Sequence, residues 1–247
     1  MMRLAKTLFA LGLLPGLALP CEVKSGPSTT ALVELYTSEG CSSCPPAEAR
    51  LAQLPGHSVA AVPLALHVPY WDYIGWKDRF AQAGFPKRQE WLAQANGSRS
   101  VYTPHFFVSG SELLGWNALE AAIRQVGVQP VRANVVLRSR PLGTGVIGLE
   151  GEASSTQTDT ALFLVVAENG LSSTIRAGEN EGRTLRHEHV VRRWIGPLPL
   201  VGGHLWTQKS LPLPADWVPG RLDLVAFVQN MKTGEVLQAV AMPACQS

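Results

Sequence analysis

The sequence lacks a large excess of charge, a basic patch and a second long apolar run. Its 247 residues include 21 Lys and Arg against 19 Asp and Glu. No basic run is interleaved with aromatic residues, so nucleic acid is not an expected partner. Residues 8–19 form the one long apolar segment, which is too short to cross a bilayer. We therefore expect no transmembrane span in the mature chain. No internal repeat or low-complexity tract is detectable.

Cysteine is also scarce, and its spacing excludes one common metal site. The four cysteines are Cys21, Cys41, Cys44 and Cys245. Only Cys41 and Cys44 form a Cys-x-x-Cys pair, whereas a four-thiolate zinc site needs two such pairs. Two interpretations of the pair remain: a redox-active disulfide, or an inert structural one.

The first twenty residues have the pattern of a secretory signal peptide. Arg3 and Lys6 precede the apolar run 8–19, and small residues near its end suit a cleavage site. We expect residues 1–20 to be removed and the protein to be periplasmic or secreted. The proline directly before Cys21 disfavours a lipoprotein anchor there.

Export also predicts a role for the other two cysteines, Cys21 and Cys245. In an oxidising compartment, four cysteines can form two disulfides. Cys21 and Cys245 lie near the two ends of the mature chain, and domain termini are often close together. The sequence therefore predicts a structural Cys21–Cys245 disulfide. The alternative is that both lie on frayed tails and remain free.

The stretch around Cys41 and Cys44 predicts redox chemistry. Residues 31–36 form an apolar run typical of a buried strand, 37–40 a loop, and a helix begins near Pro45. A helix N-terminus favours a thiolate over a thiol and so lowers a cysteine pKa. We expect Cys41 to be the nucleophile and Cys44 to resolve the mixed disulfide. The order strand, loop, helix is typical of thioredoxin-like proteins.

Other residues are candidates to support this chemistry. Thr103-Pro104 precedes an apolar strand, where a cis bond would turn the backbone toward the disulfide and form a substrate groove. Trp71 and Trp76, in an aromatic-rich loop, are expected to wall that groove or to be packing residues.

Glu34 lies inside the predicted strand 31–36. A buried carboxylate near Cys44 would act as a proton acceptor with a raised pKa. Alternatively, Glu34 points to solvent or pairs with Arg50 or Lys77. The sequence favours neither a buried proton acceptor nor a solvent-facing or ion-paired Glu34.

Histidines offer a metal-binding alternative to the expectation of no cofactor. Cys41, Cys44 and His67 together would form a copper site, although a histidine at a strand end is more often simply hydrogen-bonded. His187 and His189 alternate along a predicted strand without a third ligand nearby in sequence. We therefore expect both of them at the surface.

The composition changes near residue 128. Up to that point, strands alternate with helices, which predicts an α/β thioredoxin-like domain over 29–128. Over 129–247, seven short segments alternate in polarity between turn residues, which predicts an all-β sandwich domain. The predicted strands are 131–138, 145–152, 160–167, 185–194, 204–211, 222–229 and 236–241.

Several long motifs resemble those of the secreted DUF1223 proteins. They are 33–46 (VELYTSEGCSSCPP), 67–78 (HVPYWDYIGWKD), Arg88-Gln89, 101–104 (VYTP), 178–185 (GENEGRTL) and 190–192 (VVR). The resemblance extends over nearly the whole mature chain. It implies a relation to thioredoxin-like proteins, and it implies no substrate because the family has no settled activity.

The sequence thus predicts an exported thiol–disulfide oxidoreductase whose partners are protein thiols or disulfides. One alternative is a copper-delivery protein that uses Cys41, Cys44 and His67. The other is a redox-inert interaction module that binds through its β domain. The polar segment 178–185 is expected either to dock against the first domain or to bind a partner.

Overall fold

The computed structural model describes residues 21–54, 56 and 60–245. The predicted signal peptide, residues 1–20, lies outside the described residues. Strands predominate over helices among the described residues, with fourteen strands against three α-helices. None of the described helices is long and apolar enough to cross a membrane.

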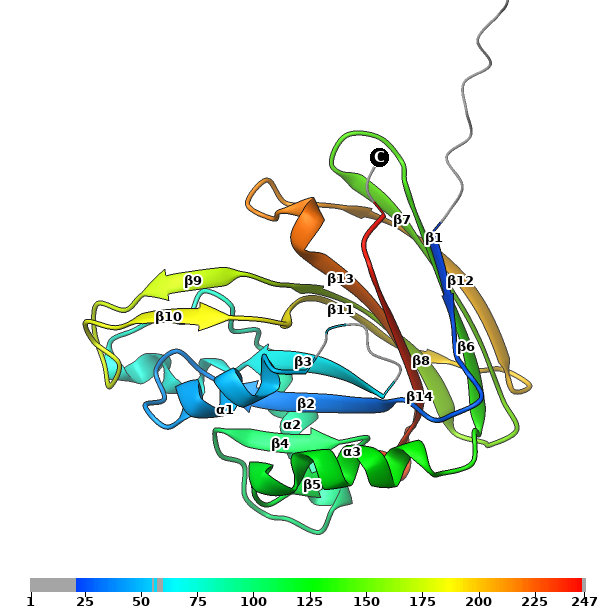
Figure 1. The fold of residues 1–247 in the computed structure, drawn as a ribbon, viewed down its shortest axis with the longest axis horizontal. Helices are drawn as coiled ribbons and strands as arrows, with labels where there is room; N and C mark the ends of the chain where they lie inside the picture. Colours follow the sequence, from blue (N-terminus) through cyan, green and yellow to red (C-terminus); the bar gives the residue numbers. More distant parts are fainter. Residues whose placement is uncertain (1–20, 55, 57–59, 246–247) are drawn as a thin grey trace, which may run out of the picture.

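Eight strands form one mixed sheet in the order β14-β13-β8-β11-β3-β2-β4-β5 (Figure 1). At one end, β2 (Ala31–Thr37) runs parallel to β3 (Ala61–His67) and antiparallel to β4 (His105–Val108), which pairs with β5 (Ser111–Leu113). β2 and β3 are buried along their whole length. Such burial explains their continuous apolar sequence, because side chains on both faces are covered.

The other end of this sheet comes from the second half of the chain. Its strands are β8 (Thr160–Glu168), β11 (Val190–Pro199), β13 (Leu222–Asn230) and β14 (Val236–Pro243), each antiparallel to its neighbour. The predicted strand 185–194 is in fact two strands. β10 (Thr184–His187) ends at His187, and β11 begins after His189, which has a left-handed φ of 58°.

The two ends meet where β11 adds to β3. Val190 is the parallel partner of Ala65, whose N–H donates to the His189 carbonyl at 2.8 Å. The expectation of an α/β thioredoxin-like domain followed by an all-β sandwich domain is therefore wrong as a fold class. The structure is a β-rich fold in which strands from both halves of the chain share one sheet. The physical reason is that the free edge of β3 is satisfied by β11.

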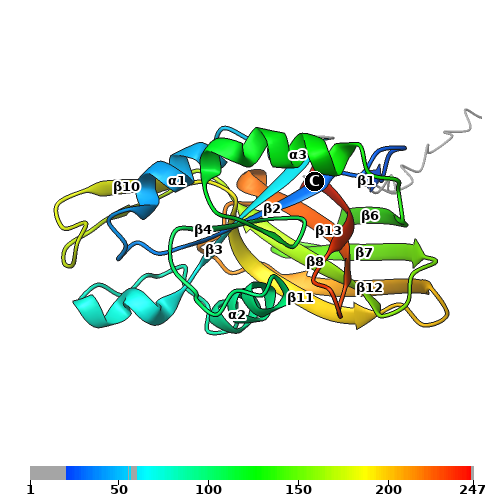
Figure 2. The ribbon, with the colours of Figure 1, turned by 90° about the horizontal axis from the view of Figure 1, so that it is seen from below.

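Helices cover opposite faces of the sheet near β2 and β3 (Figure 2). α1 (Cys44–Leu51) and α3 (Leu119–Gly127) pack on the face formed by Val33 and Leu35. α2 (Phe85–Ala95) packs on the other face, which carries Leu32 and Tyr36.

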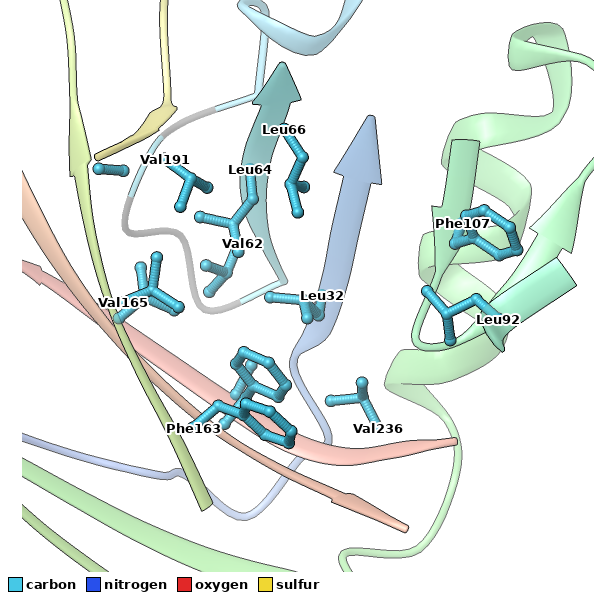
Figure 3. Close-up of a cluster of buried hydrophobic side chains, with 14 of the residues drawn as sticks. Leu32, Val62, Leu64, Leu66, Leu92, Phe107, Phe163, Val165, Val191 and Val236 are labelled. Atoms are coloured by element: carbon cyan, nitrogen blue, oxygen red, sulfur yellow. The ribbon is translucent and has the colours of Figure 1, made fainter. Parts of the chain in front are cut away.

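The core on the α2 face is continuous between the two ends of the sheet (Figure 3). Leu32 and Leu64 of β2 and β3 belong to the same buried cluster as Phe163 of β8 and Val236 of β14. The shared core means that neither half of the sheet buries its apolar face alone.

Short 3₁₀ segments occur at Pro69–Ile74 (η1), Trp116–Ala118 (η2) and Pro219–Arg221 (η3).

A second sheet of four strands packs on the face opposite α2, over β8, β13 and β14. Its order is β1-β6-β7-β12, with bounds Cys21–Lys24, Ala133–Pro141, Val146–Ser155 and His204–Pro212. Val135 and Leu149 of this sheet pack with Leu164 of β8 in one apolar cluster. The remaining strands, β9 (Leu171–Thr174) and β10, form a hairpin.

Cys21 and Cys245 are disulfide-bonded, as the sequence predicts, with their Cα atoms 5.8 Å apart. Cys21 begins β1 of the smaller sheet, whereas Cys245 follows β14 at the edge of the larger one. The bond therefore links the edges of the two sheets.

A buried ion pair crosses the core on the α2 face. Arg88 of α2 donates two hydrogen bonds, both 2.7 Å, to the two oxygens of Glu34 on β2. It also donates to Gln229 of β13 at 3.0 Å, and its guanidinium lies 4.5 Å from the ring centre of Trp194 on β11. Glu34 also accepts from the Tyr36 hydroxyl at 3.0 Å. These contacts connect α2 to strands from both ends of the sheet.

We predict that replacing Cys245 with serine lowers the free energy of unfolding by up to about 5 kcal/mol, because the disulfide closes a loop of nearly the whole described chain. Urea unfolding would measure this. Cys21→Ser and the double variant should be equally destabilised, since each loses the same bond. Additive losses in the double variant would show that each cysteine acts independently.

We predict that Arg88→Met lowers the free energy of unfolding by about 3–5 kcal/mol, because it leaves Glu34 without its buried partner. Glu34→Gln in the same chain should restore part of that loss, since an amide still accepts from Tyr36. Urea unfolding of both singles and the double gives the coupling. A double variant as unstable as the sum of the singles would contradict this account.

Candidate functional site

The Cys41–Cys44 pair lies where β2 passes into α1. The two cysteines are disulfide-bonded, with Cα atoms 5.4 Å apart. Cys44 is the first residue of α1, and Pro45 and Pro46 follow where no helical N–H donors are needed. The Ser43 hydroxyl lies 3.4 Å from Cys41 Sγ. The residues between the cysteines are exposed, but both cysteines are fully buried.

The loop that joins β9 to β10 binds the backbone of the cysteine loop. Asn180 is fully buried and its side-chain amide donates to the carbonyls of Glu39 and Cys41, at 2.9 and 3.0 Å. The Glu179 carboxylate accepts from the Ser42 N–H at 3.0 Å, which lowers the pKa of Glu179. Segment 178–185 therefore docks on the cysteine loop, which was one of its two expected roles. We call residues 175–183 the cap loop.

The aromatic loop after β3 lies on another side of the cysteine loop. A Cβ added at Gly40 would lie 2.9 Å from Trp71 Cβ, so this approach requires glycine. Trp71 Nε1 donates to Thr103 Oγ1 at 2.7 Å. The Thr103–Pro104 peptide is cis, as predicted. Trp71 thus links the cis-proline segment to the residue before Cys41, whereas the roles of Trp71, Trp76, Thr103 and Pro104 in a substrate groove stay predictions.

His187 lies between two buried carboxylates, Glu48 of α1 and Glu39 of the cysteine loop. His187 Nδ1 is 2.5 Å from Glu48 Oε2, and His187 Nε2 is 3.2 Å from Glu39 Oε1. Glu48 also accepts from the Thr37 hydroxyl at 2.6 Å, and Glu39 from Trp76 Nε1 at 2.7 Å. All of these carboxylate and imidazole groups are buried. They connect α1, the cysteine loop and β10.

A second buried histidine adjoins this triad. His67 Nδ1 is 2.7 Å from Asp78 Oδ2, and the His67 and His187 ring centres are 5.0 Å apart. Asp78 also accepts from the Glu39 N–H at 2.9 Å. Among the described residues, His67 Nε2 has no hydrogen-bond partner although it is buried.

Burial and hydrogen bonds act in opposite directions on the pKa values of this cluster. Burial lowers the pKa of His187, but hydrogen bonds to Glu39 and Glu48 outweigh it and raise that pKa to about 10. Burial lowers the pKa of His67, yet the Asp78 carboxylate raises it above its ordinary value. Burial raises the pKa values of Glu48 and Asp78, but their histidine partners hold both below the ordinary range.

The predicted surroundings of Glu34, His187 and His189 are wrong. Glu34 pairs with Arg88 on the face opposite α1, so it neither accepts a proton from Cys44 nor reaches solvent, Arg50 or Lys77. The prediction of surface positions for His187 and His189 is also wrong, because both are buried. The reason is that the strand breaks between them and His187 turns to Glu48 of α1.

The residues that sequence reasoning missed are Glu39, Glu48, Asp78 and His187. One of them had a local signal. Glu48 follows Cys44 by four residues, which places both on one face of the helix. His187 is more than 130 residues from its carboxylate partners, so no spacing connects it to them.

The fold and site define a β-rich protein with a capped disulfide of Cys-x-x-Cys spacing next to a buried cluster of carboxylates and histidines. The model of the family described as "Protein of unknown function (DUF1223)" matches residues 32–229. The chain belongs to the DUF1223 family, as its motifs indicated. No curated protein matches the sequence.

Solved structures with a similar fold include the following two. Protein AGR_C_4864 from Agrobacterium tumefaciens has a TM-score of 0.61 and 23% identity, over 89% of this chain and 96% of that one. HBP35 of Porphyromonas gingivalis has a TM-score of 0.64 and 18% identity, over 89% of this chain and 76% of that one. At these identities, the likeness concerns the fold alone.

We predict that Asn180→Ala speeds reduction of the Cys41–Cys44 disulfide by dithiothreitol, by roughly 5- to 30-fold. The variant loses two buried hydrogen bonds, each of which contributes about 1 kcal/mol to holding the cap loop closed. Trapping of free thiols with time measures the rate. Asn134→Ala, an exposed asparagine on β6, is the matched control. An unchanged rate in Asn180→Ala would show that the cap loop does not limit reduction.

Proposed function

We propose that the protein is a thiol–disulfide oxidoreductase whose active disulfide is Cys41–Cys44. The observation that carries the proposal is a disulfide between cysteines three apart in sequence, formed at the N-terminus of α1. Helix N-termini stabilise thiolates, so either cysteine is a good leaving group or nucleophile there. Protein thiols or disulfides are the proposed partners.

The proposed exchange needs no other cofactor. A partner thiolate attacks Cys41 Sγ, the Cys41–Cys44 bond breaks, and Cys44 leaves as a thiolate that takes up a proton. A second partner thiolate then attacks the partner sulfur of the mixed disulfide, and Cys41 leaves as a thiolate. The partner dithiol is oxidised to a disulfide by two electrons, and the Cys41–Cys44 pair is reduced by the same two. The reverse sequence oxidises this protein.

Two features, one of exposure and one of contact, favour Cys41 as the residue that forms the mixed disulfide. Cys41 is followed by the exposed Ser42 and Ser43, whereas Cys44 continues into α1 above buried Ala47 and Glu48. The Ser43 hydroxyl, 3.4 Å from Cys41 Sγ, is placed to donate to a thiolate there. Because both sulfurs are buried, exchange in this proposal requires movement of the cap loop.

Two disulfides in one chain also support export. Disulfides persist in the periplasm and outside the cell, whereas cytosolic thiols are kept reduced. Cys21–Cys245 in this proposal is structural, and Cys41–Cys44 is the pair that cycles.

We predict that Cys41 and Cys44 become reduced together in glutathione buffers while Cys21–Cys245 stays oxidised. Alkylation followed by mass measurement would show two added groups per chain across the transition. Cys44→Ser should accumulate a mixed disulfide on Cys41, and Cys41→Ser should not. Cys245→Ser is the control that should cycle like wild type. If the pair stays oxidised at every ratio in both wild type and Asn180→Ala, the protein is redox-inert.

A further inference from the structure

Three elements that are distant in sequence bring metal-ligand groups to one point. Glu48 comes from α1, His67 from the end of β3 and His187 from the end of β10. One ligand atom of each lies within 4.8 Å of the other two, and all three residues are buried. The β9–β10 hairpin lies beside α1 in two perpendicular views (Figures 1 and 2).

We propose that Glu48, His67 and His187 bind one divalent transition-metal ion of the zinc class. The ligand atoms are Glu48 Oε2, His67 Nε2 and His187 Nδ1. This inference is independent of the proposed disulfide exchange, because no cysteine is among the ligands.

The groups around the three ligands are arranged as metal sites require. A metal-bound histidine normally gives its other ring N–H to a carboxylate or carbonyl, which fixes its tautomer and orientation. His67 Nδ1 has Asp78 at 2.7 Å, and His187 Nε2 has Glu39 at 3.2 Å. The second oxygen of Glu48 accepts from Thr37 at 2.6 Å. Each ligand therefore has a buried partner on the atom that is not assigned to the proposed ion.

A metal-free arrangement, in which His187 only pairs with Glu39 and Glu48, does not account for the whole cluster. Hydrogen bonds among Glu39, His187 and Glu48 satisfy those three side chains. They leave His67 Nε2 buried without a partner among the described residues. A buried polar atom left unsatisfied costs about 1–3 kcal/mol, so such atoms are uncommon in stable folds. An ion bound at this nitrogen removes the deficit.

The donor set selects the class of metal. Two imidazoles and one carboxylate suit zinc and neighbouring divalent ions, and His₂Glu is a known zinc ligand set. Ca²⁺ and Mg²⁺ prefer oxygen ligands throughout. Cu(I) prefers sulfur, and all four cysteines are disulfide-bonded.

Binding requires a small adjustment of the side chains. Zinc lies about 2.0–2.2 Å from nitrogen and oxygen donors, so tetrahedral donors are roughly 3.3 Å apart. The 2.5 Å contact between Glu48 and His187 would lengthen as the ion replaces the shared proton. The wider separations, which are at most 4.8 Å, would shorten.

The test uses the oxidised, full-length mature protein with Zn²⁺ and Co²⁺ as probes. Because the cluster is buried, each metal is added both to native protein and during refolding from denaturant. We expect one equivalent per chain to survive gel filtration, a higher melting temperature, and a visible Co²⁺ absorption band. Absence of bound metal after both routes would overturn the proposal.

Variants locate the site. His67→Gln, His187→Gln and Glu48→Gln should lose the bound equivalent and the Co²⁺ band. Thr37→Val and Glu39→Gln, which alter only the groups around the ligands, should weaken affinity by roughly 10- to 100-fold while the protein stays folded by circular dichroism. His204→Ala is the matched control, because it removes an exposed histidine near a carboxylate outside the cluster.

A copper site formed by the cysteine thiolates would instead lose its metal when the cysteines are replaced. The Cys41→Ser/Cys44→Ser double variant should keep the zinc if the cluster binds it. Loss of metal in this double variant, or full binding in both His67→Gln and His187→Gln, would overturn the proposal.

Discussion

The hydrogen bonds of His187 with Glu39 and Glu48 are the interaction on which the site depends. They place the end of β10 against α1 and against the loop that leads to Cys41. The same hairpin carries Asn180, whose amide holds the carbonyls on either side of Gly40. A buried imidazole between two carboxylates thus fixes the cap loop over the disulfide, because none of these charged groups can be separated without leaving a charge unpaired in the interior.

A comparable constraint holds the sheet together on the opposite face. Arg88 of α2 binds Glu34 on β2 and Gln229 on β13, and its guanidinium lies near Trp194 on β11. These strands come from both halves of the sequence. Because β11 also fills the edge of β3, the cysteine region and the antiparallel strands share a sheet and a core. The proposed redox site is therefore supported by residues far beyond the segment that contains its cysteines.

Local patterns in the sequence predicted the elements better than their assembly. The strand before Cys41, the helix after Cys44 and most strands beyond residue 131 lie where the patterns place them. The fold class was wrong because alternation and apolar runs report which residues are buried and not which strand is their neighbour. The separation of 185–194 into β10 and β11 was also missed, since His189 adopts a left-handed conformation that its residue type does not announce.

The sequence by itself predicted the Cys21–Cys245 disulfide and the membership in a family, and both are confirmed, while the redox role of Cys41 and Cys44 stays a prediction. Each follows from residue type, spacing or motif, which are properties of neighbouring residues or of chain ends. Only the tertiary structure decided that Glu34 lies on the face of the sheet opposite α1, and that His67 and His187 meet beside Glu48. The reason is physical: a single residue on a strand faces one side or the other according to what packs there, and groups more than a hundred residues apart become neighbours only when the sheet closes between them.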